Sequence, residues 1–250
     1  MDKSISNDFD SLEVQKETFV ASINHDLKNP TIAQIRALEL FLKGNFGQIT
    51  NTQREIIEMV LDSCKYMNAM LCSLLTTYRS DKGNIKLDNE KVSISELACE
   101  CIGELIYLAK DKDINIKFYN QANKDYVYGD IIQLKRVIMN LLTNGIKYSY
   151  KNTEMRVSVF NDNNNTCFEF ENKSPFLNPE KQEKLFARYV TFSQANKALG
   201  IGLGLYASKK IVEAHEGEIY VKSFVDNRNI FGFKIPNDES LKFKNRSVTF

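Results

Sequence analysis

The first 80 residues alternate apolar and polar positions with the period of a helix. The pattern predicts a helix from about residue 12 to 43, a turn over 44–51 with two glycines and N-cap residues, and a second helix to about residue 80. The apolar stripe of the first helix consists of Phe19, Ile23, Leu27, Ile35, Leu38 and Leu42. The second helix places apolar residues at alternating spacings of three and four: Ile57, Val60, Cys64, Met67, Leu71, Leu74 and Tyr78.

Alternating spacings of three and four form a heptad seam, which is typical of helices that pack against other helices. The two helices and their short connection predict an antiparallel helical hairpin. A lone hairpin would leave much of its apolar stripe in water, so we expect two copies to form a homodimer with a four-helix bundle. This predicted dimerisation domain covers residues 1–82.

After residue 82, short strands and amphipathic helices alternate. Helices are predicted over 92–110, where Ser93 and Glu96 have the spacing of a capping box, and over 130–149, 179–187 and 203–215. Strands are predicted for INIKFY, YVYG, MRVSVF, CFEFE, GEIYVKS and NIFGFKIP. The order predicts a mixed α/β layered domain over residues 83–237 and a flexible polar tail over 238–250. The fold class is therefore α+β with two domains.

The composition is ordinary for a globular protein, with 43% hydrophobic and 26% charged residues. Lys and Arg (33 residues) nearly balance Asp and Glu (32 residues), which predicts neither a nucleic-acid nor an anionic membrane partner. No apolar run approaches the roughly 20 residues of a membrane span, and the acidic N-terminus does not resemble a signal peptide. The five cysteines have no metal-ligand spacing beyond one Cys-x-Cys pair, which indicates reduced thiols. We therefore expect a cytoplasmic protein.

The segment INHDLKNP, residues 23–30, places a histidine on the exposed face of the first helix. At about 100° per residue, His25 points roughly 160–200° away from the apolar stripe. Pro30 is expected to bend the helix just past the histidine, and a proline in mid-helix costs about 3 kcal/mol. Such a broken local rule suggests a functional site. The adjacent Asp26 carboxylate can hold one imidazole N–H while the other nitrogen attacks an electrophile. His25 is therefore a candidate nucleophile, and the alternative is an idle surface histidine.

The predicted helix 130–149 carries a polar stripe that is unusual for a solvated face. An arc of about 80° holds Gln133, Arg136, Asn140, Asn144 and Lys147. Two asparagines in mid-helix are weak helix formers, which favours a ligand site over a plain wet face. Their oxygens suit Mg²⁺, which keeps several waters and bridges to substrate phosphates. Lys147 can reach a phosphate, and Tyr148 can pack on a flat base.

The segment ALGIGLGLY, residues 198–206, places Gly200, Gly202 and Gly204 before an apolar helical pattern. Glycines at the start of a helix let backbone N–H groups approach a phosphate, and the helix N-terminus favours negative charge. The spacing is not that of a dinucleotide-binding fold, and the run by itself is also compatible with a plain turn. Together with the histidine and the amide stripe, it predicts phosphate chemistry.

In combination, these motifs resemble those of bacterial sensor histidine kinases over roughly residues 14–236. INHDLKNP is similar to the H-box of that family, NLLTNGIKYS to its N-box, KLFARY to its F-box and GIGLGLYASKKIVEAHEGEI to its G2 box and following helix. The resemblance implies a HisKA-type dimerisation and histidine-phosphotransfer hairpin. It also implies a Bergerat-type ATP-binding domain, an α/β sandwich whose mixed sheet has helices on one face.

The resemblance implies roles for individual residues. His25 would be phosphorylated, Asp26 would orient or deprotonate it, and Asn29 would position water for dephosphorylation of a partner. Contacts with Mg²⁺ and ATP are implied for Asn144 (main metal ligand), Asn140 (supporting metal ligand), Lys147, Tyr148, Gly200, Gly202 and Gly204. The phosphoryl group would pass to the receiver domain of a response regulator.

One motif departs from the family pattern of Asp-x-Gly-x-Gly, because residues 172–176 read NKSPF. Asn172 replaces the aspartate that accepts a hydrogen bond from the adenine amino group, and its neutral oxygen would accept that bond less strongly. Ser174 and Phe176 replace both glycines, and Phe176 would be strained in a glycine-only conformation.

We expect a two-component histidine kinase that uses Mg²⁺ and ATP to phosphorylate His25. The segment between Tyr189 and Gly200 is short for a nucleotide lid, although Arg188 and Lys197 can reach phosphates. Only 24 residues precede His25, so we expect a separate sensor protein, the bundle or a missing part to supply the input. Two alternatives stay open. One is a phosphotransfer adaptor or pseudokinase with weak or absent ATP binding, and the other is a gyrase-like or mismatch-repair-like ATPase, which the heptad hairpin argues against.

Overall fold

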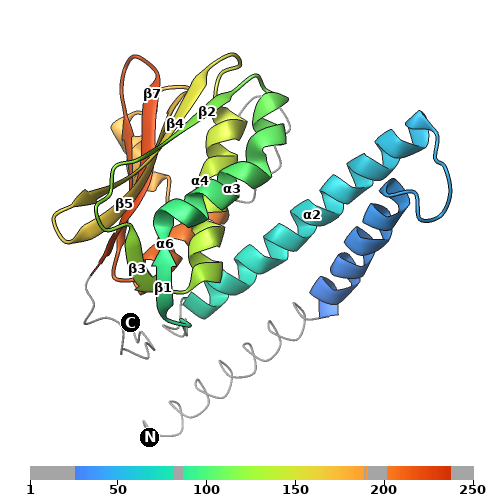
Figure 1. Ribbon diagram of the computed structural model, residues 1–250, viewed down its shortest axis with the longest axis horizontal. Helices are drawn as coiled ribbons and strands as arrows, with labels where there is room; N and C mark the ends of the chain where they lie inside the picture. Colours follow the sequence, from blue (N-terminus) through green and yellow to red (C-terminus); the bar gives the residue numbers. More distant parts are fainter. Residues whose placement is uncertain (1–25, 81–86, 189, 191–201, 238–250) are drawn as a thin grey trace, which may run out of the picture. The chain divides into compact units, whose positions relative to one another are not determined.

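The computed structural model describes residues 26–80, 87–188, 190 and 202–237 of the chain (Figure 1). The chain divides into two compact units, Met1–Tyr78 and Arg79–Phe250. The predicted domain boundary between residues 82 and 83 and the predicted tail 238–250 lie outside the described residues, as do three predicted site residues: His25, Lys197 and Gly200.

The described part of the first unit is a pair of helices joined by a turn. The first helical segment covers 26–42, and α2 covers Asn51–Ser80. Gly44 and Gly47 in the turn have φ values of 79° and 103°, which favour glycine. Thr50 precedes α2 as a capping residue: its Oγ1 accepts from Gln53 N at 3.2 Å, and Gln53 Oε1 accepts from Thr50 N at 2.9 Å.

The heptad seam is only partly covered within one chain. Cys64 and Leu71 of the predicted seam are buried, and Cys64 Sγ donates to Gln34 Oε1 of the first helix at 3.7 Å. Val60 and Met67 of the same seam are 44% and 41% exposed. Leu27, which the sequence predicts on the buried stripe, is 50% exposed. The apolar surface that the pattern predicts is therefore present, and much of it faces outward in a single chain.

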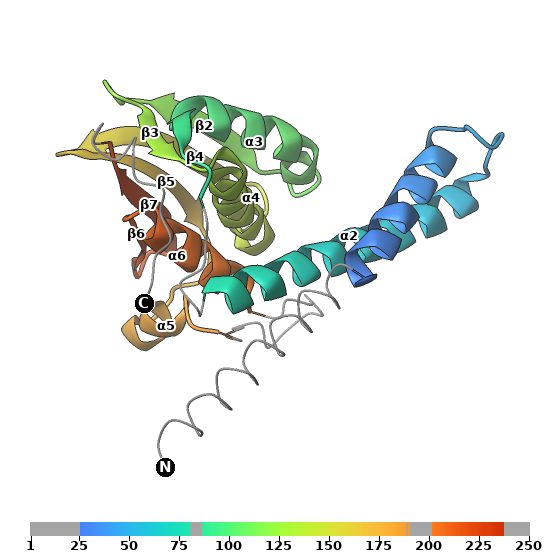
Figure 2. The same cartoon turned by 90° about the horizontal axis from the view of Figure 1, so that it is seen from below.

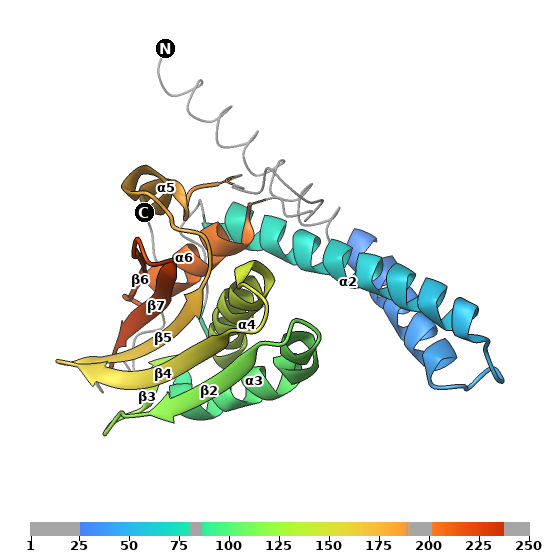
Figure 3. The same ribbon diagram turned by 90° about the horizontal axis from the view of Figure 1, so that it is seen from above.

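The second unit is a layered α/β domain. Its five-stranded sheet has the order β2-β4-β5-β7-β6; β2 and β4 are parallel and the other pairs antiparallel. The helices α3, α4 and α6 cover one face of this sheet (Figures 2 and 3). The elements are β1 Glu90–Ser93, α3 Ile94–Lys110, β2 Asn115–Asn120, β3 Tyr126–Gly129, α4 Ile131–Tyr148, β4 Glu154–Asp162, β5 Asn165–Lys173, α5 Pro179–Lys184, α6 Gly204–Ala214, β6 Glu218–Ser223 and β7 Arg228–Pro236.

Most of these elements match the predicted ones within a few residues. The helix α3 starts two residues later than predicted because Ser93 is its N-cap, where Oγ accepts from Glu96 N at 3.2 Å. The sequence did not predict β1, a four-residue strand that pairs with β3 and has only one buried residue. Such a short strand shows no alternation of apolar and polar positions.

The core lies between the sheet and α4. The predicted apolar face of α4 is fully buried: Leu134, Val137, Ile138, Leu141 and Leu142. It packs in one cluster with sheet residues that include Val157, Phe168, Phe170 and Phe233. Because this face is held by the sheet, the polar stripe of α4 has a fixed direction. Within the described ranges, no helix combines the length and the apolar character needed to cross a bilayer.

Gly145 lets α4 approach the sheet closely. A Cβ at Gly145 would lie 2.7 Å from Met155 Cε and 2.7 Å from Phe170 Cε2. We predict that Gly145→Ala lowers the free energy of unfolding by about 1–3 kcal/mol through overpacking. The matched control is Gly103→Ala on the exposed side of α3, where nothing lies within 4 Å and a gain of about 0.5–1 kcal/mol is expected. Denaturant unfolding measures the change in the free energy of unfolding for both variants. Equal changes would contradict the close packing at Gly145.

Asp125 ties β3 to the start of α3. Its Oδ2 accepts hydrogen bonds from Ser93 Oγ at 2.7 Å and from Ser95 Oγ. Burial opposes ionisation of Asp125, but the hydrogen bonds from Ser95 and Ser93 lower its pKa below the ordinary value. A lowered carboxyl pKa stabilises the folded state above the unfolded-state pKa, and this stabilisation is lost as the pH falls through the folded-state pKa.

We therefore predict that Asp125→Asn destabilises the domain at pH 7 by about 1–3 kcal/mol, because hydrogen bonds to a charged acceptor are lost. The difference from the unaltered chain should shrink as the pH is lowered below about 4, near the ordinary aspartate pKa. Thermal unfolding at a series of pH values measures this difference. A constant difference from pH 7 to pH 3 would be inconsistent with an ionised Asp125.

Candidate functional site

Two motifs that are far apart in the sequence meet where α4 and α6 pack together; Asn140 and Ser208 are separated by 68 positions. The side chain of Asn140 on α4 donates through Nδ2 to Ser208 Oγ on α6 at 2.8 Å. A Cβ at Gly204, the first residue of α6, would lie 2.6 Å from Asn140 Oδ1. Glycine therefore leaves room for the amide, whose oxygen lies against the beginning of α6.

The backbone before α6 is shaped by glycine. Gly202 has a φ of 71°, a conformation that other residues rarely adopt. The N-cap of α6 is Leu203, whose side chain makes no capping hydrogen bond. The residue at the N-cap position therefore does not cap α6 with its side chain, and a helix start of this kind next to an amide oxygen suits an anion with its metal.

The side-chain oxygens in the described structure suit a Mg²⁺ ion that is also bound by a substrate better than an ion whose ligands all come from the protein. Asn140 and Asn144 lie one turn apart on α4, and both side chains are half-buried. Within the described part of the chain, no group of three or more His, Cys, Asp or Glu side chains is arranged to hold a metal ion. Mg²⁺ commonly takes one or two protein oxygens together with waters and substrate phosphates. Two amide oxygens match that requirement.

Positive charge gathers at the other end of α4. Lys112 Nζ donates to Ile146 O at 3.1 Å and to Lys147 O, so it caps the last carbonyls of the helix. Burial and then the nearby Lys151 and Lys147 lower the pKa of Lys112. Lys147 Nζ lies 5.4 Å from the centroid of the Tyr148 ring, which is partly exposed. This end of the helix offers cationic groups and an aromatic face to a ligand.

Asn172 joins the end of β5 to the end of α4. Its Nδ2 donates to Gly145 O at 3.1 Å and to Ser149 Oγ at 2.8 Å, and its Oδ1 accepts from Ser174 Oγ at 3.3 Å. A carbonyl oxygen only accepts, so the NH₂ of Asn172 must face Gly145. The side chain is buried, and both ends of its amide are engaged inside the domain.

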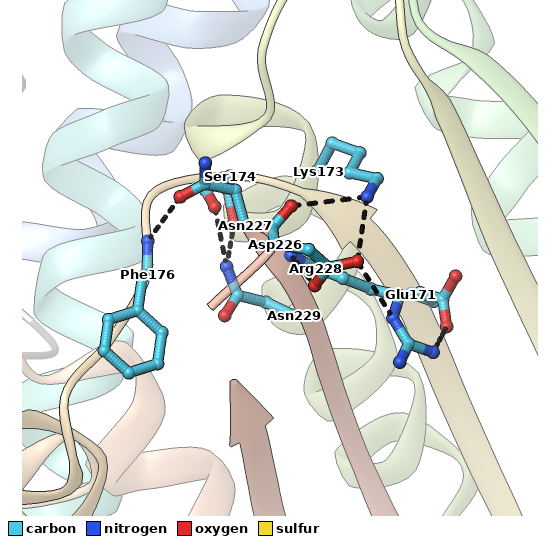
Figure 4. Close-up of polar contacts among 8 residues, drawn as sticks. All are labelled: Glu171, Lys173, Ser174, Phe176, Asp226, Asn227, Arg228 and Asn229. Carbon is cyan, nitrogen blue, oxygen red and sulfur yellow. Dashed lines mark hydrogen bonds and ion pairs between the residues drawn. The ribbon is translucent and has the colours of Figure 1, made fainter. Parts of the chain in front are cut away.

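The residues that replace two family glycines are not strained. Neither Ser174 nor Phe176 is among the described residues with positive φ, so the segment does not adopt the glycine-only conformation considered from the sequence. The Phe176 side chain is 38% exposed. Figure 4 shows its ring pointing away from the polar contacts of the segment.

Arg188 lies beside the first turn of α6. Its guanidinium donates to Tyr206 Oη at 3.0 Å and lies 4.8 Å from the centroid of that ring. Lys210 Nζ is 5.9 Å from the same centroid. Arg188 is thus close to the helix that begins at Gly204. Asp26 and Asn29 are exposed on the helical segment of the first unit.

Sequence reasoning missed several polar residues that support the site. Ser208 and Ser149 hold Asn140 and Asn172, and Lys112 caps α4. Serines and lysines give no periodic signal, so only spatial contacts reveal them. The second histidine, His215, is a satisfied core residue: its Nε2 accepts from Asp130 N at 3.0 Å, and its Nδ1 lies 2.7 Å from Ile211 O.

The chain is similar to known proteins over this region. A model of the family described as Histidine kinase-, DNA gyrase B-, and HSP90-like ATPase matches residues 129–239. The range includes α4, the segment 172–177 and α6. The matched region therefore contains both sides of the site: Asn140, Asn144 and Gly204 on one side, and Asn172 on the other.

Relatives and solved structures extend the similarity to most of the chain. The circadian input-output histidine kinase CikA of Synechococcus elongatus is 26% identical over 225 residues, 88% of this chain and 30% of that protein. The adaptive-response sensory kinase SasA of Synechococcus sp. (strain JA-3-3Ab) is 25% identical over 223 residues, 88% of this chain and 59% of that protein.

Full-length ShkA in complex with AMPPNP aligns with a TM-score of 0.70 and 19% identity, over 88% of this chain and 45% of that chain. This likeness shows the fold. The chain spans 30% and 59% of the length of the two curated relatives CikA and SasA. The chain is thus a homologue of histidine kinases that are longer than it is.

Proposed function

Because residues 129–239 belong to the histidine kinase-, DNA gyrase B- and HSP90-like ATPases, we propose that this chain is the core of a two-component sensor histidine kinase. It would transfer the γ-phosphoryl group of ATP to His25 and then to an aspartate of a response regulator receiver domain. The observation that carries the proposal is the contact between Asn140 of α4 and Gly204 of α6. That contact joins a candidate metal ligand to a candidate phosphate-binding loop.

Substrate binding would use both ends of α4. The phosphates would lie at the uncapped start of α6, where Gly202 and Gly204 allow close approach of backbone N–H groups. Arg188 would contribute positive charge on the α6 side and Lys147 on the α4 side. The base would lie toward Tyr148 and Asn172. Lys197 and Gly200, outside the described residues, are proposed to complete the phosphate site.

Asn144 and Asn140 would hold Mg²⁺ through their side-chain oxygens. When bound, the ion would neutralise the charge that develops on the transferred phosphoryl group. Ser208 keeps the NH₂ of Asn140 engaged, so that the amide oxygen is left for the ion. Phosphoryl transfer needs little covalent help from the protein, and positioning by these residues is the main contribution.

His25 is proposed as the nucleophile. One imidazole nitrogen forms a bond to the γ-phosphorus while the bond from that phosphorus to the β–γ bridging oxygen breaks, and ADP leaves. Asp26 would hold the N–H of the other ring nitrogen. Asn29, exposed one turn after His25, would position water when the regulator is dephosphorylated. A separate sensor protein is a proposed source of input.

The similarity to histidine kinases favours signalling over a gyrase-like ATPase. The family description includes gyrase B, so the ATPase domain alone does not separate the two. CikA and SasA, in contrast, match 88% of the chain. The rival within signalling is an adaptor or pseudokinase that retains the bundle but has weak or absent ATP binding. Asn172 favours this rival, because its amide is already hydrogen-bonded inside the domain. The contact between Asn140 and Gly204 argues against the rival.

Incubation with Mg²⁺ and γ-labelled ATP tests the proposal. We predict acid-labile label on the chain that disappears in His25→Gln. Asn144→Ala should reduce labelling at least about tenfold, because the proposed main metal ligand is lost. Asn123→Ala, at an exposed loop position, is the matched control and should label normally.

The outcomes separate the alternatives. Absence of both label and nucleotide binding would contradict a kinase and support the adaptor. Undiminished label in His25→Gln would overturn the assignment of the nucleophile.

We also propose a homodimer through the hairpin, because Val60 and Met67 of the heptad seam are exposed in one chain. Light scattering at micromolar concentration should give a dimer. The double variant Val60→Asp/Met67→Asp should give a monomer, because each buried carboxylate would lose its hydration. Glu58→Gln, at an exposed position on roughly the opposite side of the same helix, should leave the dimer intact. A monomeric unaltered chain would contradict the bundle.

A further inference from the structure

The segment after β5 is fixed to the turn between β6 and β7 by its own backbone. Ser174 N donates to Asn227 O at 2.9 Å, and Phe176 N donates to Asn227 Oδ1 at 3.2 Å. Leu177 N donates to Ser223 Oγ at 2.8 Å. Pro175 has no N–H, so every backbone donor from residue 174 to 177 has a partner in this turn or at the end of β6.

Asn229 on β7 holds the same segment from inside the domain (Figure 4). Its Nδ2 donates to Ser174 O at 3.0 Å, to Ser174 Oγ at 2.6 Å and to Pro175 O at 3.1 Å. Two of these acceptors are carbonyl oxygens, which fixes the orientation of the amide, because a carbonyl cannot donate. The Asn229 side chain is buried, so these bonds are shielded from water.

Ion pairs on the outside of the turn contribute less. Lys173 Nζ lies 3.3 Å from Asp226 Oδ2, and Arg228 Nη1 lies 3.2 Å from Glu171 Oε2. All four side chains are at least 30% exposed, and exposed ion pairs are weak. The buried bonds of Asn229 therefore hold residues 174–175 more firmly than these ion pairs do, together with the bonds to Asn227 and Ser223.

The oxygen of Asn229 is left without a donor. Asn229 Oδ1 is buried and makes no hydrogen bond in the described structure. A buried acceptor without a partner costs free energy, and a native structure normally supplies one. A ligand N–H that reached this atom would restore the missing bond. Asn229 Oδ1 is therefore a candidate acceptor for a ligand N–H.

Asn172, the other asparagine of this region, is engaged. Its Oδ1 accepts from Ser174 Oγ at 3.3 Å. Asn172 and Asn229 are directly opposed in the register of β5 and β7, so their side chains lie on the same face of the sheet. Asn172 reaches Gly145 and Ser149 of α4, so this is the face that α4 covers. The two amides thus lie together at the end of α4. Asn229 Oδ1 makes no hydrogen bond in the described structure, whereas Asn172 Oδ1 already accepts one.

We infer that Asn229 determines base recognition at this site, with its NH₂ group holding Ser174 and Pro175 and its Oδ1 accepting from an amino group of the nucleotide base. The acceptor function would then lie on β7 at Asn229, in place of position 172 on β5. This inference rests on the proposed function, since it concerns the base end of the same nucleotide site.

Binding of two diphosphates to the full chain with Mg²⁺ tests the inference by calorimetry without phosphoryl transfer. The pair is ADP and purine riboside 5′-diphosphate, which lacks the 6-amino group. We expect the unaltered chain to bind ADP about two- to tenfold more tightly, the effect of one neutral hydrogen bond. In Asn229→Leu the two affinities should become nearly equal.

A second variant separates the two roles of the amide. Asn229→Asp keeps an acceptor but removes the N–H donors, so both diphosphates should bind more weakly while the preference for ADP remains. Asn123→Ala, at an exposed loop position, should change neither affinity. Binding of Mg²⁺-tripolyphosphate and a thermal unfolding transition check that each variant retains its fold and its phosphate end. Asn229→Ala replaces Asn229→Leu if the larger apolar side chain prevents folding.

The outcomes are distinct. An unchanged preference for ADP in Asn229→Leu or Asn229→Ala would overturn the inference and leave the proposed kinase standing. Loss of the preference in Asn172→Ala alone would assign the acceptor to Asn172 and also overturn it. No binding of either diphosphate by the unaltered chain would contradict the proposed function itself, and the inference with it.

Discussion

The close packing of α4 on the sheet is the constraint on which the second unit depends. Its apolar face is fully buried against Phe168, Phe170 and Phe233, and Gly145 allows the approach that this burial requires. Since one face of the helix is fixed, Asn140 on the polar stripe is directed to Ser208 and Gly204 of α6. The functional residues are therefore positioned by apolar packing, and hydrogen bonds set their final orientation.

Polar contacts in the middle and at the C-terminal end of α4 refine that position. Ser208 engages the NH₂ of Asn140 in the middle of the helix, while Lys112 caps the last carbonyls and Asn172 binds Gly145 O near the end. After β5, the side-chain amides of Asn229 on β7 and Asn227 in the β6–β7 turn fix the segment that carries Ser174 and Phe176. Replacement of glycine here produces an anchored segment without backbone strain.

The sequence predicted the elements well where periodicity was strong. The apolar face of α4, the strands of the main sheet and the start of α3 at a capping serine follow from residue spacing alone. The four-residue β1 was missed because it is too short to show a period. The contact between Asn140 and Gly204 could not be predicted from residue spacing, because the two positions are far apart in the sequence. Only the resemblance to a family suggested that they share a site.

Supporting residues were harder to predict for a physical reason. Ser208, Ser149, Lys112 and Asn229 act through tertiary hydrogen bonds, which leave no pattern in the local sequence. The concern about Phe176 assumed a glycine-like backbone, and the structure shows an ordinary one because the β6–β7 turn supplies partners for the N–H groups of the segment. His25 lies outside the described residues, so its role stays a prediction from the sequence.

The central claim is that the end of α4 and the start of α6 form one nucleotide site. Amide hydrogen exchange of the full chain with and without Mg²⁺-ADP tests it most directly. The account predicts slower exchange from Gly202 to Tyr206 and around Ser149, with little change in the exposed hairpin turn at 43–47. Binding of Mg²⁺-ADP that left exchange at Gly202–Tyr206 unchanged would contradict it.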